Sequence, residues 1–155
     1  MVNVEFDYVL DLVKYARVHG GFTLNVKHRR QRLAGDGGYV LSVGHCEMRL
    51  NACYSDPQVA VMLKAYINAN LACLGVVGYH LGCWIDGGYV YFDVTQVVNS
   101  AEVACRLCEE RCEIAFFDVD NQVSVTVAEY RMLQKRGVDL DWKSDCDCPI
   151  CEMYK

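Results

Sequence analysis

The sequence predicts an α+β fold: a single domain with a mostly antiparallel sheet built from β-hairpins and three or four helices packed on it. Three observations predict this class. Several segments place apolar residues at helical spacing, other short runs alternate apolar and polar residues, and glycine-rich turns join those runs. The 155 residues are 53% hydrophobic and 23% charged, which is enough for one sizeable core.

The first predicted helix covers residues 4–18. Its apolar stripe consists of Phe6, Val9, Leu10 and Val13. Gly20-Gly21 ends it, as glycine after a helix does. The alternating runs 22–26 and 39–43 follow, and we expect them to pair as a hairpin with a long loop.

The next predicted helix starts behind Ser55, Asp56 and Pro57, which suit a cap and a first helical turn. It extends to about residue 72, so residues 22–72 form a first hairpin–helix unit. The sequence Asp-Gly-Gly-Tyr-Val at 36–40 recurs at 86–90. Reuse of a favourable turn and duplication of a unit both explain this repeat.

The second hairpin–helix unit is predicted over residues 79–112. Asp86-Gly87-Gly88 provides a tight turn between two arms rich in aromatic and β-branched residues. A helix capped by Asn99 or Ser100 follows, and a final hairpin over 114–127 turns at Asp120-Asn121. Residues 1–127 are therefore interpreted as one domain, and residues 128–155 as a short helix and an acidic, cysteine-rich tail.

The charge of the chain is unevenly distributed. The net charge is −5, and residues 101–155 carry twelve acidic against seven basic side chains, whereas residues 1–100 carry equal numbers. This balance excludes a general nucleic-acid binder, which needs a basic surface. The acidic segment either supports solubility or binds a basic protein partner, with Glu109, Glu110 and Glu113 as candidate contacts.

Four basic residues interrupt this pattern within one predicted hairpin loop: Lys27, Arg29, Arg30 and Arg32. Arginine forms bidentate contacts with carboxylates and phosphates, so this loop is a second candidate binding element. The alternative interpretation is a solvated hairpin tip.

Ten cysteines invite a disulfide interpretation, but the first residues lack the features of a secretory signal, so we expect reduced thiols. Cys105, Cys108 and Cys112 share one face of a predicted helix with small residues. That pattern is typical of a narrow packing seam.

Cys146, Cys148 and Cys151 are the candidate metal ligands. Three thiolates this close can bind zinc if a fourth ligand comes from elsewhere. The alternatives are a redox pair formed by Cys148 and Cys151 and an exposed tail without a ligand. Zinc is the only cofactor that the sequence suggests.

No other motif indicates chemistry. Paired carboxylates, phosphate-binding glycine loops and nucleophile–base pairs are not recognisable, so we expect a protein that is not an enzyme. No apolar run is long enough to cross a bilayer, so we expect no membrane insertion.

A resemblance adds to this interpretation. It depends on three segments: the Tyr- and Asp-rich hairpin 84–94, the helix 102–110, and the short strand 114–119 that ends in Asp118 and Val119. Together they resemble small accessory proteins of bacteriophages and mobile elements, over roughly residues 20–127. The cysteine-rich tail departs from that pattern, and Cys105 and Cys108 stand where such proteins have alanine or leucine.

The resemblance implies a cytoplasmic protein of the bacterial host cell that inhibits a defence factor by stoichiometric binding, as anti-CRISPR and antirestriction proteins do. The expected partner is a host complex that handles nucleic acid, and no direct nucleic-acid contact is expected. The alternative is a small zinc-binding or thiol-sensing regulator that uses the C-terminal cysteines. The sequence indicates no oligomeric state.

Overall fold

The computed structural model describes residues 3–44 and 46–137 and confirms the α+β class. Within these residues five helices pack on eight strands, and the strands pair in antiparallel fashion. The elements are α1 (Phe6–His19), β1 (Gly21–Asn25), β2 (Arg30–Gln31), β3 (Tyr39–Ser42), β4 (Met48–Asn51), α2 (Asp56–Ala69), α3 (Leu71–Leu74), β5 (Tyr79–Asp86), β6 (Tyr89–Val98), α4 (Ala101–Glu110), β7 (Ala115–Asp118), β8 (Val123–Thr126) and α5 (Val127–Lys135). They group into two compact units: unit 1 (Met1–Arg32 and Val43–Gln96) and unit 2 (Leu33–Ser42 and Val97–Lys155).

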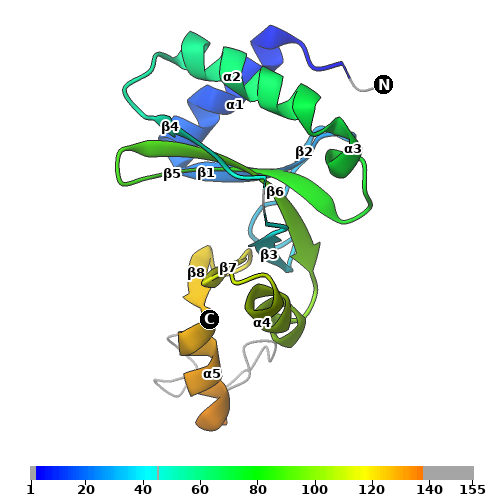
Figure 1. Cartoon of the computed structure of the whole chain (residues 1–155), viewed down its shortest axis with the longest axis vertical. Coiled ribbons are helices and arrows are strands. Elements are labelled where there is room, and N and C mark those ends of the chain that lie inside the picture. The colour runs from blue at the N-terminus through cyan, green and yellow to red at the C-terminus, as the bar shows by residue number, and fades with distance from the viewer. Residues whose placement is uncertain (1–2, 45, 138–155) are drawn as a thin grey trace. The chain divides into compact units, whose positions relative to one another are not determined.

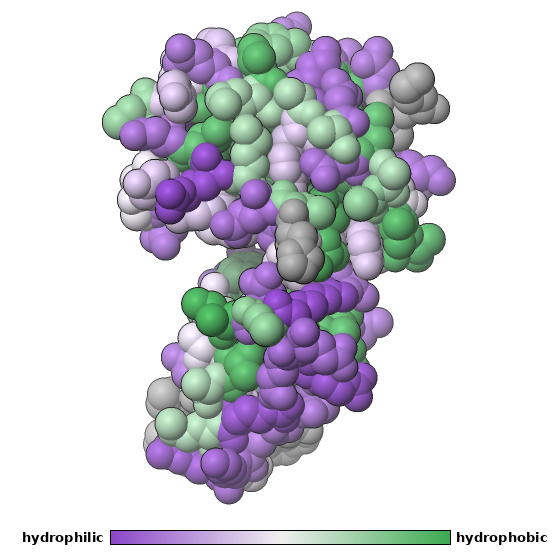
Figure 2. All heavy atoms as spheres, in the orientation of Figure 1, coloured by the Kyte–Doolittle hydropathy of each residue, from purple (hydrophilic) through white to green (hydrophobic). Residues whose placement is uncertain are grey.

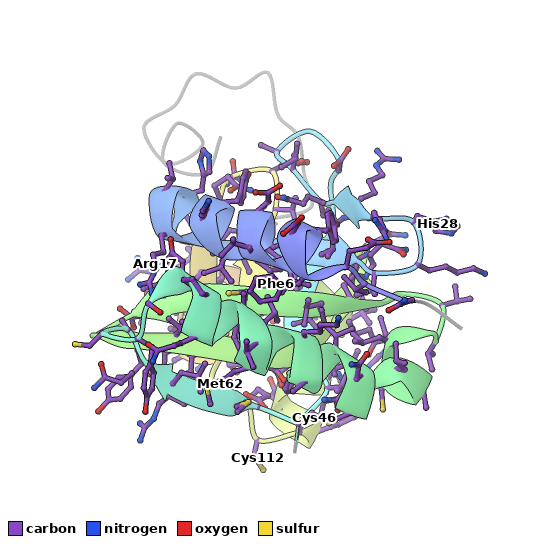
Figure 3. All side chains as sticks on the ribbon, turned by 90° about the horizontal axis from the view of Figure 1, so that it is seen from above. Phe6, Arg17, His28, Cys46, Met62 and Cys112 are labelled. Atoms are coloured by element: carbon purple, nitrogen blue, oxygen red, sulfur yellow. The ribbon has the colours of Figure 1, made fainter. Side chains whose placement is uncertain are left out.

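Unit 1 is a sheet covered on one face by two helices. β1 pairs with β2 and β5, β5 pairs with β6, and β4 pairs with β6. Helices α1 and α2 lie side by side across this sheet (Figure 1), and Figure 3 shows the pair from above with Phe6 and Arg17 on α1 and Met62 on α2. The fully buried side chains between helices and sheet include Val9, Val59, Leu63, Ile67, Leu81, Phe92 and Val94.

Local signals explain where the helices of unit 1 begin and end. The Ser55 hydroxyl accepts a hydrogen bond from the Gln58 backbone amide, and the Gln58 side-chain oxygen accepts one from the Ser55 backbone amide, which forms a capping box at the start of α2. Gly20 adopts a left-handed conformation (φ 87°) and its amide donates to Ala16, which ends α1. Arg17 then fastens α1 to the start of α2 through an ion pair with Asp56.

Unit 2 contains a second, smaller core. β3 pairs with β7, β7 pairs with β8, and α4 packs on β3 and β7. Ser100 caps α4, and Thr126 with Glu129 forms a capping box for α5. The core consists of Tyr39, Leu41, Ala101, Ala104, Cys105, Cys108, Phe116, Val125 and Tyr130.

The predicted pairing of runs 22–26 and 39–43 is wrong, so residues 22–72 do not form a hairpin–helix unit. β1 instead turns tightly into β2, with Leu24 opposite Gln31 and Asn25 opposite Arg30, while Tyr39 on β3 lies opposite Asp118 on β7. Of the charged residues that read as a loop, Arg30 begins the second arm of a short hairpin, whereas Lys27 and Arg29 lie in its turn. Turn residues show where a chain reverses, but they do not determine which strand a run pairs with.

The other predicted hairpins are confirmed. Asp86 lies opposite Tyr89 across the two-residue turn at Gly87-Gly88, and Ala115 lies opposite Thr126 in the hairpin of β7 and β8. The predicted helix reaching residue 72 ends at Ala69, and Asn70 separates it from the one-turn helix α3. In the described part of the chain, no helix has the length and apolar character needed to span a membrane.

Candidate functional site

Three aromatic rings and one guanidinium form a continuous surface on unit 1, which we call the aromatic–arginine surface: Arg49, Trp84, Tyr89 and Tyr91. The rings of Trp84 and Tyr91 are stacked, with centroids 5.3 Å apart and an interplanar angle of 10°. Tyr89 follows at 6.3 Å from Tyr91, and the Arg49 guanidinium carbon lies 4.4 Å from the centroid of the Tyr89 ring.

The pleat of the sheet places these residues on the face away from the core. Val90, Phe92 and Val94 point towards the helices and are buried, so the alternating Tyr89 and Tyr91 point to the opposite face. Tyr89 is 37% exposed, Trp84 and Tyr91 are half-buried, and Arg49 on β4 is exposed. Tryptophan, tyrosine and arginine are the residue types most enriched among the energetically dominant residues of protein interfaces.

The sequence interpretation missed this surface, although part of its signal was present. The two-residue turn at Gly87-Gly88 places Asp86 opposite Tyr89, and the same register places Trp84 opposite Tyr91. Arg49 could not be found this way because the short strand β4 has no strand signal of its own.

The predicted basic loop is an ordered hairpin tip, marked by His28 in Figure 3. Arg29 forms an ion pair with Glu5 at 2.8 Å, donates to the Asn3 carbonyl oxygen at 3.1 Å, and lies 4.8 Å from the centroid of the Tyr8 ring. Its side chain therefore holds the hairpin to the N-terminal segment. Lys27 and Arg30 are exposed and Arg32 is half-buried.

The predicted acidic contacts divide into two groups. Glu109 forms an ion pair with Arg131 of α5 at 2.6 Å, and Glu102 binds the same guanidinium at 3.1 Å. Glu110 is exposed at the end of α4, and Glu113 is partly exposed three residues later. Hydrophilic side chains cover much of α4 and α5 on the face of unit 2 in Figure 2. Some of them form hydrogen bonds that hold α5 against α4.

This network shifts the pKa values of its members. Desolvation acts to raise the pKa of Glu102, but hydrogen bonds from Gln134 and Arg131 outweigh it and lower that pKa below its usual value. The hydrogen bond from Arg131 likewise lowers the pKa of Glu109. Both carboxylates therefore stabilise the folded state above a pH of about 4.5, and this contribution is lost as the pH falls through their lowered folded-state pKa values.

We expect α5 to lose helical structure when the pH falls below about 4.5, because protonated glutamates release Arg131. The ¹³Cα chemical shifts of residues 127–135, followed from pH 6.5 to pH 3, measure this loss. In Arg131→Gln we expect reduced helicity already at pH 6.5 and a flatter profile. Lys135→Gln, which removes an exposed charge from the same helix, is the control and keeps the wild-type profile. If the helicity of α5 depends on pH in the same way in Arg131→Gln and wild type, the ion pairs of Arg131 do not stabilise α5.

The predicted cysteine seam is confirmed for two of its three members. Cys105 and Cys108 are fully buried with Ala101 and Ala104, where α4 packs on the strands of unit 2. Burial raises the thiol pKa to about 12 for Cys105 and about 11 for Cys108, so both thiols stay protonated. Cys112 was placed on the wrong face because α4 already ends at Glu110; it is exposed, with φ 57°.

The candidate zinc ligands Cys146, Cys148 and Cys151 lie outside the described residues. Within residues 3–44 and 46–137, no group of three or more His, Cys, Asp or Glu side chains is placed to hold a metal ion.

No protein family model, curated protein or solved structure matches this chain.

Proposed function

We propose that this chain is a non-catalytic binding protein of a bacteriophage or mobile element that inhibits a host defence factor, in the manner of anti-CRISPR or antirestriction proteins. The observation that carries the binding role is the aromatic–arginine surface. Its rings are held in place by contacts with one another and by the sheet beneath them, so little conformational entropy is lost when a partner covers them. The inhibitor role rests on the resemblance of roughly residues 20–127 to small accessory proteins of bacteriophages and mobile elements.

In this proposal the partner is a protein of a nucleic-acid-handling complex in the bacterial cytoplasm. The aromatic–arginine surface supplies affinity. The exposed Glu110, the partly exposed Glu113 and the exposed Lys27 contribute charge complementarity and steer the encounter. Glu109 and Arg29 contribute less to binding because each already has an ion-pair partner within the chain.

The test is affinity capture of the tagged, reduced chain from bacterial lysate, with and without nuclease, read by mass spectrometry. We expect one nucleic-acid-handling complex to be retained after nuclease treatment. Trp84→Ala is expected to weaken binding to the purified complex by at least about tenfold, because truncating a central aromatic residue costs about 2 kcal/mol or more.

Tyr54→Ala is the matched control. Tyr54 is also an exposed aromatic residue of unit 1, 46% accessible, but it is not part of the aromatic–arginine surface. Equal capture by Trp84→Ala and Tyr54→Ala would show that the surface is not where the partner binds. Capture that disappears with nuclease would contradict a protein partner.

A further inference from the structure

Strand β4 is an edge beside the aromatic–arginine surface. Met48, Arg49, Leu50 and Asn51 lie opposite Phe92, Tyr91, Val90 and Tyr89 of β6, and among the described residues β6 is the only strand that pairs with β4. An open edge presents backbone donors and acceptors to any extended chain that approaches it.

The register shows which groups point outwards. The amide of Ala52 donates to the carbonyl oxygen of Gly88 at 2.9 Å, so this pair is hydrogen-bonded across the ladder. Antiparallel ladders alternate, so the pair of Leu50 and Val90 is also hydrogen-bonded and the pair of Arg49 and Tyr91 is not. The backbone N–H and C=O of Arg49 therefore point away from β6, to the open side of β4.

The Arg49 side chain is prepared for an anion. The guanidinium lies over the Tyr89 ring, which covers one of its faces, and in the described part of the chain no carboxylate forms an ion pair with it. Arg49 is exposed to solvent. An arginine that is already held over an aromatic ring loses little freedom on binding a carboxylate with two parallel hydrogen bonds.

We infer that the β4 edge binds an extended segment of the partner protein and that the partner residue opposite Arg49 is aspartate or glutamate. Backbone pairing with Arg49 sets the register, and the side chain opposite it then falls on the same face as the guanidinium, next to Tyr89 and Tyr91. This inference rests on the proposed function in one respect, namely that the partner is a protein.

The test uses the full chain and the peptide acetyl-Thr-Val-Glu-Val-Thr-amide. Binding is followed through the backbone amide and side-chain Nε resonances of Arg49 in ¹⁵N-labelled protein. We expect saturable shifts at Arg49 and at its neighbours on β4. Replacing the glutamate by glutamine should weaken binding about tenfold, because the charge-assisted hydrogen bonds are lost.

Two further peptides test the backbone pairing. In an antiparallel pairing, the amide of the glutamate opposite Arg49 faces β4, so its N-methylation removes a donor and is expected to abolish binding. The amide of the following valine points away from β4, so its N-methylation leaves binding intact. In the protein, Arg49→Gln should lose the preference for glutamate. Arg106→Gln, an exposed arginine of unit 2, should keep it.

The inference would be overturned if the Arg49 resonances do not shift, or if they shift equally with the glutamate and the glutamine peptides. Arg49 would then be a charged edge residue that protects β4 against pairing with other strands. Tighter binding of oligothymidylate at the same resonances would assign the surface to nucleic acid instead. Failure of this inference can be distinguished from failure of the proposed function. If Trp84→Ala loses the captured complex but no peptide binds at β4, the proposed function is retained and only the binding of a segment at the β4 edge is rejected.

Discussion

Phe92→Ala is expected to lower the free energy of unfolding by about 3–5 kcal/mol, because it removes a fully buried aromatic side chain and leaves a cavity. Phe92 lies in the middle of β6 under the two helices, and its ring centroid is 5.7 Å from that of Tyr66 on α2. Neighbouring side chains are held by the sheet and the helices, so they can fill only part of the space. Urea denaturation followed by circular dichroism measures the loss.

Phe6→Ala is the matched control because it makes the same chemical change near the protein surface. Phe6 begins α1 and is 36% exposed. Its truncation removes less buried area and leaves a site that water can fill, so we expect a loss of about 1 kcal/mol. Equal losses for the two variants would show that Phe92 does not occupy the centre of the core of unit 1.

The elements that could be predicted from the sequence are those defined by local chemistry. The hairpin of β5 and β6 follows from Gly87-Gly88 between two aromatic arms, and α2 and α4 follow from their serine caps and apolar stripes. Even the burial of Cys105 and Cys108 followed from their helical spacing beside alanines.

What could not be predicted depends on contacts between distant segments. β2 and β4 are two and four residues long and carry charged side chains, so neither has the apolar alternation of a strand. They are strands because a neighbouring strand supplies their hydrogen bonds.

In the candidate site, too, some contacts follow from local sequence and others depend on distant segments. Trp84 and Tyr91 lie opposite each other within one hairpin, so their pairing is readable from the turn, whereas Arg49 joins them only through the pairing of β4 with β6. The ion pair of Glu109 with Arg131 required the packing of α5 against α4, which places together residues 22 positions apart. The sequence therefore identified Glu109 as an accessible charge, although it has a partner in the fold.

Gly20 and Gly21 show that adjacent identical residues can be required for different reasons. In sequence both read as the end of α1. In the structure only Gly20 has that role, with its left-handed conformation, and Gly20→Ala is expected to cost about 1 kcal/mol. Gly21 is the first residue of β1 and lies opposite Trp84 on β5.

Gly21→Ala is expected to lower the free energy of unfolding by about 3 kcal/mol. A methyl group at this position would collide with the carbonyl oxygen of Cys83 and lie 3.0 Å from the Cα of Trp84, so backbone atoms of β5 would have to move. Gly75→Ala is the control: its nearest neighbour would be the Leu71 carbonyl oxygen at an ordinary 3.4 Å, and we expect a change within about 0.5 kcal/mol. Equal effects in urea denaturation would contradict the close approach of β1 to β5. Because the strand that must yield carries Trp84, Gly21→Ala is also expected to weaken partner capture, which ties the stability of this contact to the aromatic–arginine surface.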